Sequence, residues 1–481
     1  MSTRELPTES DPAPPTKALP LVPPLPPDTS PEPRGKNLLD YRLFRAVMES
    51  PLYPRVFQWA VLAGFVFVGY QLLAGPQAPS QNVGTVLMWV IWWPLIPIAF
   101  LLMSRFWCAI CPFATINDWV QKVVGLERPV PPFLKKYGIW IIDASFIAIT
   151  WADHMWGVVA SPWGSGIMVL LLTTAVVVSG ALWQRRAFCR YLCFLGGVSG
   201  NYSRTAGISL RADQVICKTC TSRAVCFNGS ADVPGCPLFS FPRTMDSNAE
   251  CNLCANCIKN CPNGAITVTL RKPTQELWFM DKPKIEVAFL AMAIMGIVLY
   301  QNLSMLEIWP SVLDQLGSIL RTDYYPVVFT VAFALAIAIP VGTLALASRI
   351  AAPRSTETVW QNFARFGYAL IPLDIAAHMA HNLFHLLSEG KAVIFTAMPL
   401  IGQDMPTDSP ALLGPAVIQV LQFALLALGV AASIYAAYRV SRRRYPAKAI
   451  HRRVVSPFVV LIVGFGLLNV WMFTLPMLHR V

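Results

Sequence analysis

Nine stretches of the chain are apolar enough and long enough to cross a lipid bilayer as helices, and this pattern limits the fold more than any other feature. A bilayer core of about 30 Å requires roughly 20 apolar residues in a helix. Hydrophobic residues make up 55% of the chain and charged residues only 13%, which argues against a purely soluble protein. We therefore expect a mostly α-helical, polytopic membrane bundle. The expected spans lie near residues 56–74, 84–104, 137–156, 165–184, 285–304, 326–348, 367–387, 415–438 and 455–477.

The positions of the basic residues test this division, because Lys and Arg are enriched in the cytoplasmic loops of membrane proteins. If the N-terminus lies in the cytoplasm and the spans alternate, all but three of the 38 Lys and Arg residues fall on the cytoplasmic side. The exceptions are Arg321, Lys391 and Arg480. We expect nine spans, with the N-terminus inside and the C-terminus outside. The net charge of +12 then reflects sorting across the membrane and does not indicate a nucleic-acid partner.

These spans divide the chain into four expected regions. Residues 1–50 form a cytoplasmic tail, which is expected to be disordered because its first 34 residues are rich in Pro, Ser, Thr, Asp and Glu. Residues 51–204 hold four membrane helices and two cysteine pairs. Residues 205–275 form the single soluble domain of any size, on the cytoplasmic side. Residues 276–481 hold five more membrane helices, one of which carries several histidines.

Eight of the 12 cysteines lie in the expected soluble domain, in two runs that point to iron–sulfur clusters. The run from Cys251 to Cys261 reads C-x2-C-x2-C-x3-C-P, in which the first three thiolates bind one cubane and the fourth binds the other. The run from Cys217 to Cys236 reads C-x2-C-x5-C-x9-C-P, the same motif with insertions. We expect two [4Fe–4S] clusters with crossed ligands. One is held by Cys217, Cys220, Cys226 and Cys261, and the other by Cys236, Cys251, Cys254 and Cys257.

Zinc sites and disulfides are the alternatives for these eight residues. Structural zinc sites usually combine two C-x2-4-C pairs across a longer gap and do not need a compact triple of cysteines. Disulfides are rare in the cytoplasm, where thiols are kept reduced. Both alternatives are therefore less favoured than iron–sulfur clusters.

The other four cysteines form two pairs at the expected cytoplasmic ends of membrane helices. Cys108 and Cys111 follow the second span, and Cys189 and Cys193 follow the fourth. Each pair is preceded by an Arg-x-aromatic sequence, so the two hairpins look like a parallel internal repeat. Four thiols could meet there to hold a metal or act as a redox-active dithiol. Alternatively, they are reduced thiols that pack as small apolar groups.

Two membrane-edge cysteine pairs followed by a two-cluster ferredoxin domain resemble the membrane polyferredoxins, over about residues 84–275. Relatives of this kind are NapH, the C-terminal half of NosR, and the CcoG-type proteins. Here the first pair is C-x2-C-P where the family usually has C-x3-C-P, and Phe194 replaces the proline of the second. The longer layout, with a histidine-bearing membrane half, is similar to the FtrD-type component of ferrous-iron uptake systems. The resemblance implies a bacterial cytoplasmic-membrane protein that exchanges electrons with periplasmic redox systems.

The seventh expected span carries Asp374, His378, His381 and His385, which share one helix face. Ionisable groups inside a membrane are costly and usually functional. His154 ends the third span on the same expected outer side. These five residues could form a metal site, a b-type haem site, or a quinol and proton site. Alternatively, they are polar residues satisfied by neighbouring helices.

These features favour a membrane iron–sulfur electron-transfer protein, working between a cytoplasmic donor or quinol and a periplasmic redox or metal-handling partner. The alternatives are a membrane subunit of an iron or copper uptake system and a metalloenzyme maturation factor, each with a redox or regulatory iron–sulfur domain. No catalytic triad, Gly-rich nucleotide loop or flavin motif occurs in the sequence. The chain is therefore expected to be an electron-transfer component of an oxidoreductase system and not a self-contained dehydrogenase.

Overall fold

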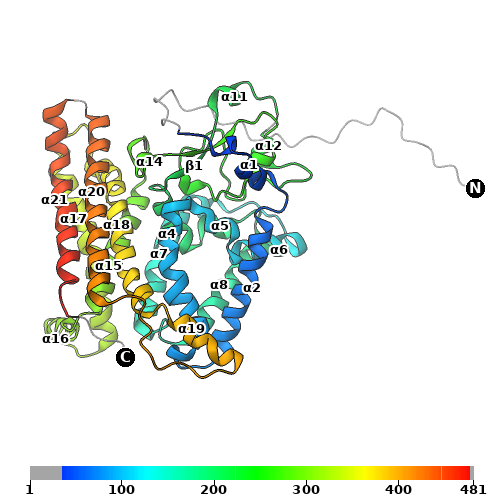
Figure 1. The fold of residues 1–481 in the computed structure, drawn as a ribbon. Coiled ribbons are helices and arrows are strands. Elements are labelled where there is room, and N and C mark those ends of the chain that lie inside the picture. Colours follow the sequence, from blue (N-terminus) through cyan, green and yellow to red (C-terminus); the bar gives the residue numbers. More distant parts are fainter. Residues whose placement is uncertain (1–34, 223, 446, 477–481) are drawn as a thin grey trace, which may run out of the picture.

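The computed structural model describes residues 35–222, 224–445 and 447–476. Long helices stand side by side in a bundle, and a small domain with few regular elements covers one end (Figure 1). The short helices α16 (Trp309–Leu320) and α19 (Ala392–Ala397) lie at the opposite end. The main helices of the bundle are α2 (Arg55–Ala74), α4 (Trp93–Met103), α7 (Pro132–Trp156), α8 (Pro162–Leu182), α15 (Ile285–Ser304), α17 (Tyr325–Ala351), α18 (Val359–Glu389), α20 (Pro415–Arg444) and α21 (Lys448–Met472). The three-residue helix α3 (Val83–Thr85) leads into the span that contains α4.

The expected mostly α-helical membrane bundle is confirmed. Within the described ranges, seven helical stretches are long and apolar enough to cross a membrane. The number becomes eight if α18 and the helices that follow it, bent by 55°, form one broken span. The third expected span is present as α7 but is outside this set, because Asp143 and Asp153 interrupt its apolar sequence. Nine spans and their orientation therefore stay predictions.

Helix α15 lies at the centre of the larger half of the bundle, and most of its side chains are buried against α17 and α18. Small residues allow this close packing. A Cβ added to Gly296 of α15 would lie 2.4 Å from the carbonyl oxygen of Ala336 in α17. A Cβ added to Gly429 of α20 would lie 2.3 Å from the Cβ of Ala376 in α18. Small residues at helix contacts are typical of membrane bundles, where close van der Waals packing drives association.

The second expected span differs from a regular helix. A π-helical segment, Val86–Trp92, precedes α4, and the chain turns at Ser104, which has a left-handed backbone (φ 55°). Two shorter helices follow, α5 (Trp107–Ile110) and α6 (Pro112–Val124). The cysteines at this end of the span therefore lie in a broken, irregular segment and not on one continuous helix.

The small domain is built around a two-stranded antiparallel sheet. Strand β1 (Ile208–Ala212) pairs with β2 (Ile266–Leu270), and the loops between them carry α11 (Gln214–Lys218), α12 (Val225–Asn228) and α13 (Asn256–Lys259). Its apolar core includes several cysteines together with Leu210, Val268 and residues from the N-terminal segment. A ferredoxin-like domain at residues 205–275 stays a prediction from the cysteine spacing.

The N-terminal segment differs from the expected disordered tail over its last part. Residues 1–34 lie outside the described residues. From residue 35 onward the chain packs on the small domain: Asn37 forms a β-bridge with Thr269, and its side chain accepts a bond from the Val268 N–H (3.1 Å). Helix α1 (Arg42–Glu49) and Tyr53 follow, and Tyr53 donates to the Leu253 carbonyl (2.7 Å). The apolar residues of this short segment are sufficient to order it against the domain.

A buried carboxylate joins the small domain to the bundle. Glu276, in α14 (Gln275–Trp278), is 1% exposed and forms ion pairs with Arg271 (2.8 Å), Arg211 (3.1 Å) and Arg204 (3.4 Å). It also accepts a bond from the Ser247 hydroxyl (2.7 Å). Despite burial, the three arginines hold the pKa of Glu276 at about 2. The charge network fixes the domain at its attachment to α10 (Phe194–Ser203) and the strands.

Candidate metal centres

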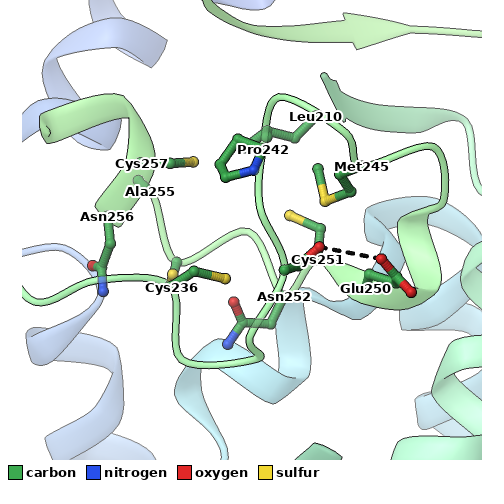
Figure 2. Close-up of a pocket in the computed structure, with 12 residues that line it drawn as sticks. Leu210, Cys236, Pro242, Met245, Glu250, Cys251, Asn252, Ala255, Asn256 and Cys257 are labelled. Atoms are coloured by element: carbon green, nitrogen blue, oxygen red, sulfur yellow. Dashed lines mark hydrogen bonds between the residues drawn. The ribbon is translucent and has the colours of Figure 1, made fainter. Parts of the chain in front are cut away.

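Four cysteines of the expected crossed set line one small pocket in the small domain. They are Cys236, Cys251, Cys254 and Cys257. In Figure 2 the sulfurs of Cys251 and Cys257 point into this space, and Cys236 reaches it from a separate loop. The backbone is left-handed at Leu253 (φ 56°) and Ala255 (φ 63°), so the chain changes direction between successive cysteines. This local twist presents three close neighbours in sequence to one centre.

Burial makes these thiols poor acids in the absence of a metal. Burial raises the pKa of Cys251 to about 12 and, together with the neighbouring Cys236 thiol, that of Cys254 to about 11. Each would keep its proton at neutral pH as a free thiol, so binding iron must release protons. The donor set, four cysteine sulfurs that line one pocket, fits a [4Fe–4S] cluster. We refer to these four residues as set A.

The other four cysteines of the domain also gather, nearer its surface. Burial and then the Cys261, Cys217 and Cys220 thiols raise the pKa of Cys226 to about 12. Cys220 is exposed, and bonds with Ser222 (3.0 Å) and Asn263 (3.2 Å) lower its pKa. We refer to Cys217, Cys220, Cys226 and Cys261 as set B. Its exposure, compared with the enclosed set A, makes it the part of the domain that is more accessible to a partner.

The two membrane-edge pairs adopt the same local structure. Cys108 lies in α5, and Cys111 is the residue that immediately precedes α6. Cys189 lies in α9 (Ala187–Tyr191), and Cys193 immediately precedes α10. Each pair is therefore a short helix followed by the N-terminus of a longer one, as expected for an internal repeat. A helix N-terminus favours a thiolate, because its free N–H groups carry partial positive charge.

The two pairs also come together in space. The Cys108 sulfur lies 3.6 Å from the hydroxyl oxygen of Ser199 in α10, the helix that begins after Cys193. Burial raises the pKa of Cys193 to about 12, and the Cys111 and Cys108 thiols contribute to this rise. Burial also raises the pKa of Cys189, with contributions from Cys193 and Cys108. We refer to these four residues as the tetrad.

The tetrad adjoins set A. Cys254 forms one buried apolar cluster with Ala109 and Ile110, the two residues between Cys108 and Cys111. The guanidinium of Arg186 is close enough to both groups to interact electrostatically with Cys189 and Cys254. The irregular segment after α4 therefore places one cysteine group directly beside the next.

Two buried arginines, one from each repeat, lie beside the tetrad. Arg186 pairs with Asp118 through two bonds (2.6 and 2.9 Å) and donates to the Cys108 carbonyl (3.2 Å). Arg105 is 3% exposed, donates to the Ala249 carbonyl and lies 3.9 Å from the Cys108 sulfur. The repeated Arg-x-aromatic-Cys sequence marked both positions, but nothing in the sequence indicates that Asp118 neutralises one of them.

The histidine helix is α18, and its polar residues have separate partners. Tyr202 Oη lies 2.8 Å from His378 Nδ1, and His381 Nδ1 lies 2.8 Å from the Asn302 side-chain oxygen. His385 lies 3.3 Å from Glu389 and packs its ring against His381. Asp374 is fully buried, and neither carboxylate oxygen has a hydrogen-bond partner.

His154 does not join this group. Its ring packs against Tyr300 of α15, whereas His381 bonds with Asn302 of the same helix. Tyr300 and Asn302 are two residues apart, so their side chains point about 200° apart around the helix axis. Helix α15 therefore lies between His154 and His381. In the described part of the chain, no three His, Cys, Asp or Glu side chains lie close enough together to hold a single metal ion. A metal or haem at these five positions stays a prediction.

Comparison with known proteins supports iron–sulfur binding by the first half of the chain. A family described as a 4Fe-4S binding domain matches residues 85–131 and 165–210. The chain is 26% identical over 240 residues to "Putative electron transport protein YccM" of Escherichia coli (strain K12), which covers 45% of this chain and 64% of the relative. Both findings support a 4Fe-4S membrane protein of the polyferredoxin type. The chain thus matches less than two thirds of that relative's length. No solved structure matches.

The two matched segments contain the tetrad and not the ferredoxin-like run from Cys217 to Cys261. The first segment runs from the start of the broken second span to the residue before α7. The second segment runs from within α8 to within β1. The match is consistent with the internal repeat read from the sequence. It leaves the eight cysteines of sets A and B to be assigned from their spacing and positions alone.

Proposed function

We propose that this protein is a membrane electron carrier in which sets A and B each hold one [4Fe–4S] cluster. Each cluster supplies a one-electron redox centre in the domain. The observation that carries the proposal is the continuous series of cysteine groups, from the exposed set B through the enclosed set A to the tetrad at the membrane edge. Such a series provides closely spaced positions for single electrons to pass from the domain surface into the bundle.

The residues of the chain supply binding, insulation and charge. Cys251 and Cys257 of set A pack against the apolar core of the domain, and apolar surroundings would limit water and lower the local dielectric at a cluster held there. Set B presents Cys220 to solvent, where a soluble donor or acceptor can approach. We place the domain in the cytoplasm of a bacterial cell, because the basic residues fall on that side. The opposite end of the bundle then meets a periplasmic redox or metal-handling partner, and quinol is a second source of electrons.

Iron and sulfide analysis of the purified membrane protein tests the cofactors. We expect about eight iron and eight sulfide at these two sites, with a reducible cluster signal in electron paramagnetic resonance spectra. Cys257→Ala should remove about four iron from set A, and Cys226→Ala about four from set B. A protein that holds zinc and no iron would contradict the proposal.

Electron transfer is tested in lipid vesicles that expose the small domain and enclose ferricyanide. Addition of dithionite outside should bleach the enclosed ferricyanide in wild-type vesicles. Cys257→Ala, in set A, should slow this bleaching strongly. Cys220→Ala should slow it too, because it removes the exposed ligand of set B where electrons enter. Equal rates for the wild type, both variants and empty vesicles would refute transmembrane electron transfer.

The buried carboxylate of Asp374 supports a second candidate, a subunit of a metal uptake system. An unpaired ionisable group deep in a membrane bundle is characteristic of ion or proton paths. Asp374→Asn and His378→Ala separate the two functions. Loss of metal uptake with unchanged ferricyanide reduction would favour the transport function. Loss of ferricyanide reduction with intact clusters would favour the electron carrier.

A further inference from the structure

An apolar groove lies at the corner where α1 leads into the membrane helix α2, beside the small domain (Figure 1). Residues from both helices and from the turn between them line it, among them Val47, Leu52, Val56 and Phe57. Leu52 is 64% exposed and Val56 is 54% exposed. Helix α1 packs on the small domain through Phe44 and Met48. The groove is therefore an apolar surface that the domain leaves uncovered.

Two exposed tryptophans indicate that this groove lies at the level of the membrane surface. Trp59 of α2 and Trp119 of α6 are each about half exposed, and their ring centroids are 5.0 Å apart. Tryptophans of membrane proteins are enriched at the membrane–water interface. Arg55 precedes Trp59 by four residues, so the two side chains lie one turn apart on the same face of α2. Arg55 is therefore at the height of the lipid headgroups, next to the groove.

Two cations meet at this corner without an anion between them. Lys259 of α13 donates to the carbonyl of Tyr53, a residue that lines the groove (2.5 Å). The Arg55 guanidinium is close enough to Lys259 for the two positive charges to repel each other. Among the described residues, no carboxylate lies within ion-pair distance of either cation. Arg55 is also the first residue of α2, where a helix carries partial positive charge. An anion bound here would relieve this repulsion.

We propose that this corner is a binding site for one anionic phospholipid. The lipid phosphate accepts charge-assisted hydrogen bonds from Arg55 and Lys259, and an acyl chain lies in the groove along Val56 and Phe57. Cations and an exposed apolar surface adjoin at this corner, which matches a molecule with a charged head and an apolar chain. A free phosphate ion would leave the groove empty. The site goes beyond the proposed electron transfer and does not depend on whether sets A and B hold clusters.

The lipid site adjoins the segments that support set A. Lys259 follows Cys257 by two residues, in the same short helix. Tyr53, which accepts the bond from Lys259, donates in turn to the carbonyl of Leu253, between two cysteines of set A. A phosphate held by Lys259 is therefore connected through Tyr53 to the loop that directs these thiols. The bound lipid thus links that loop to the membrane surface.

Native mass spectrometry of the full-length protein, stripped of lipid in detergent, tests the site with phosphatidylglycerol and phosphatidylcholine. The wild type should bind one phosphatidylglycerol about tenfold or more tightly than phosphatidylcholine, because each of the two cations attracts the anionic lipid. Arg55→Gln/Lys259→Gln should abolish this preference. Arg349→Gln/Lys272→Gln removes the same two charges from exposed positions outside the groove and should keep it. Equal affinity of the wild type for both lipids, or an unchanged preference in Arg55→Gln/Lys259→Gln, would overturn the proposal.

Further arms separate the parts of the site. Arg55→Gln alone keeps the Lys259 bond to Tyr53, so the fold of the corner is retained, and it should still bind phosphatidylglycerol several-fold more weakly. Leu52→Ser/Val56→Ser keeps both cations and should weaken the binding of both lipids. Glycerol 3-phosphate, which has no acyl chain, should not displace phosphatidylglycerol at equal concentration, and displacement would overturn the lipid assignment. Bound lipid is counted by mass, so the result does not depend on iron content or on electron transfer.

Discussion

The buried carboxylate of Glu276 allows a quantitative prediction about how the small domain is held. The three arginines around it lower its pKa from 4.5 to about 2. Since one pKa unit corresponds to about 1.4 kcal/mol, the ionised form contributes about 3 kcal/mol to the stability of the domain. Glu276→Gln keeps the shape of the side chain and removes its charge, which leaves three arginines without their shared partner. We therefore expect a loss of at least 3 kcal/mol.

The assay is thermal unfolding of the detergent-solubilised protein, followed by the loss of iron–sulfur absorbance and by intrinsic fluorescence. For a domain of this size about 1 kcal/mol corresponds to roughly 4–8 °C, so the domain transition of Glu276→Gln should fall by about 10 °C or more. Glu49→Gln, at an exposed glutamate of α1, is the matched control and should change little. The transition of the membrane bundle should be nearly the same in all three proteins.

The pH dependence provides the refuting result. A carboxylate whose pKa is lowered by folding contributes its stability above the unfolded pKa, and this is lost as the pH falls from about 4.5 towards 2. Between pH 5 and 8 the difference between wild type and Glu276→Gln should therefore be constant. A difference that disappears between pH 5 and 8, or a variant as stable as Glu49→Gln, would show that Glu276 is not an ionised anchor.

Two further predictions concern packing in the bundle and support for set A. Gly296→Ala should destabilise the bundle by about 1–3 kcal/mol, because the added Cβ would lie 2.4 Å from a carbonyl oxygen of α17. Gly342→Ala is the control, because the space around Gly342 is open, and it should be neutral or stabilising. Thermal unfolding measures both. Tyr53→Phe removes the buried hydrogen bond to the Leu253 carbonyl. It should lower domain stability by about 1–3 kcal/mol and speed the loss of iron from set A to a chelator. Tyr41→Phe, at an exposed tyrosine, is the control and should change neither the stability nor the rate of iron loss.

The cysteine spacing predicts which thiols share a centre, whereas composition gives the wrong N-terminal boundary for the ordered part of the chain. The crossed membership of sets A and B is a prediction from the ferredoxin-type run, in which the last thiolate binds the other cluster. In the structure Cys236 lines one pocket with Cys251, Cys254 and Cys257, and the ligand assignment stays a prediction. The packing of Asn37 and Tyr53 on the domain was missed, since their partners, Thr269 and Leu253, are more than 190 residues away. A composition that is rich in proline up to residue 34 gave no sign of order immediately after it.

The histidine helix shows a different limit. The spacing of Asp374, His378, His381 and His385 on one face is observed in α18, but a shared face does not determine shared partners. Asn302 and Tyr202, which bond with two of the histidines, come from other helices whose rotation about their own axes cannot be read from apolar sequence. Long membrane helices are apolar on all sides, so the sequence pattern that orients a surface helix of a soluble protein is missing.

Helix α10 connects the tetrad with the histidine helix. The sequence pattern gave no sign that these two features are neighbours. It begins after Cys193, contacts Cys108 through Ser199, and one turn later places the Tyr202 hydroxyl against His378. Three residues of helix rise about 4.5 Å, so the polar groups of α18 start close to the last cysteine group. A charge at the tetrad would therefore act more strongly on Tyr202 and His378 than on His381 and His385, which lie nearer the end of α18. This order makes His378 the histidine whose replacement should most affect the redox properties of the tetrad, whichever partner lies beyond it.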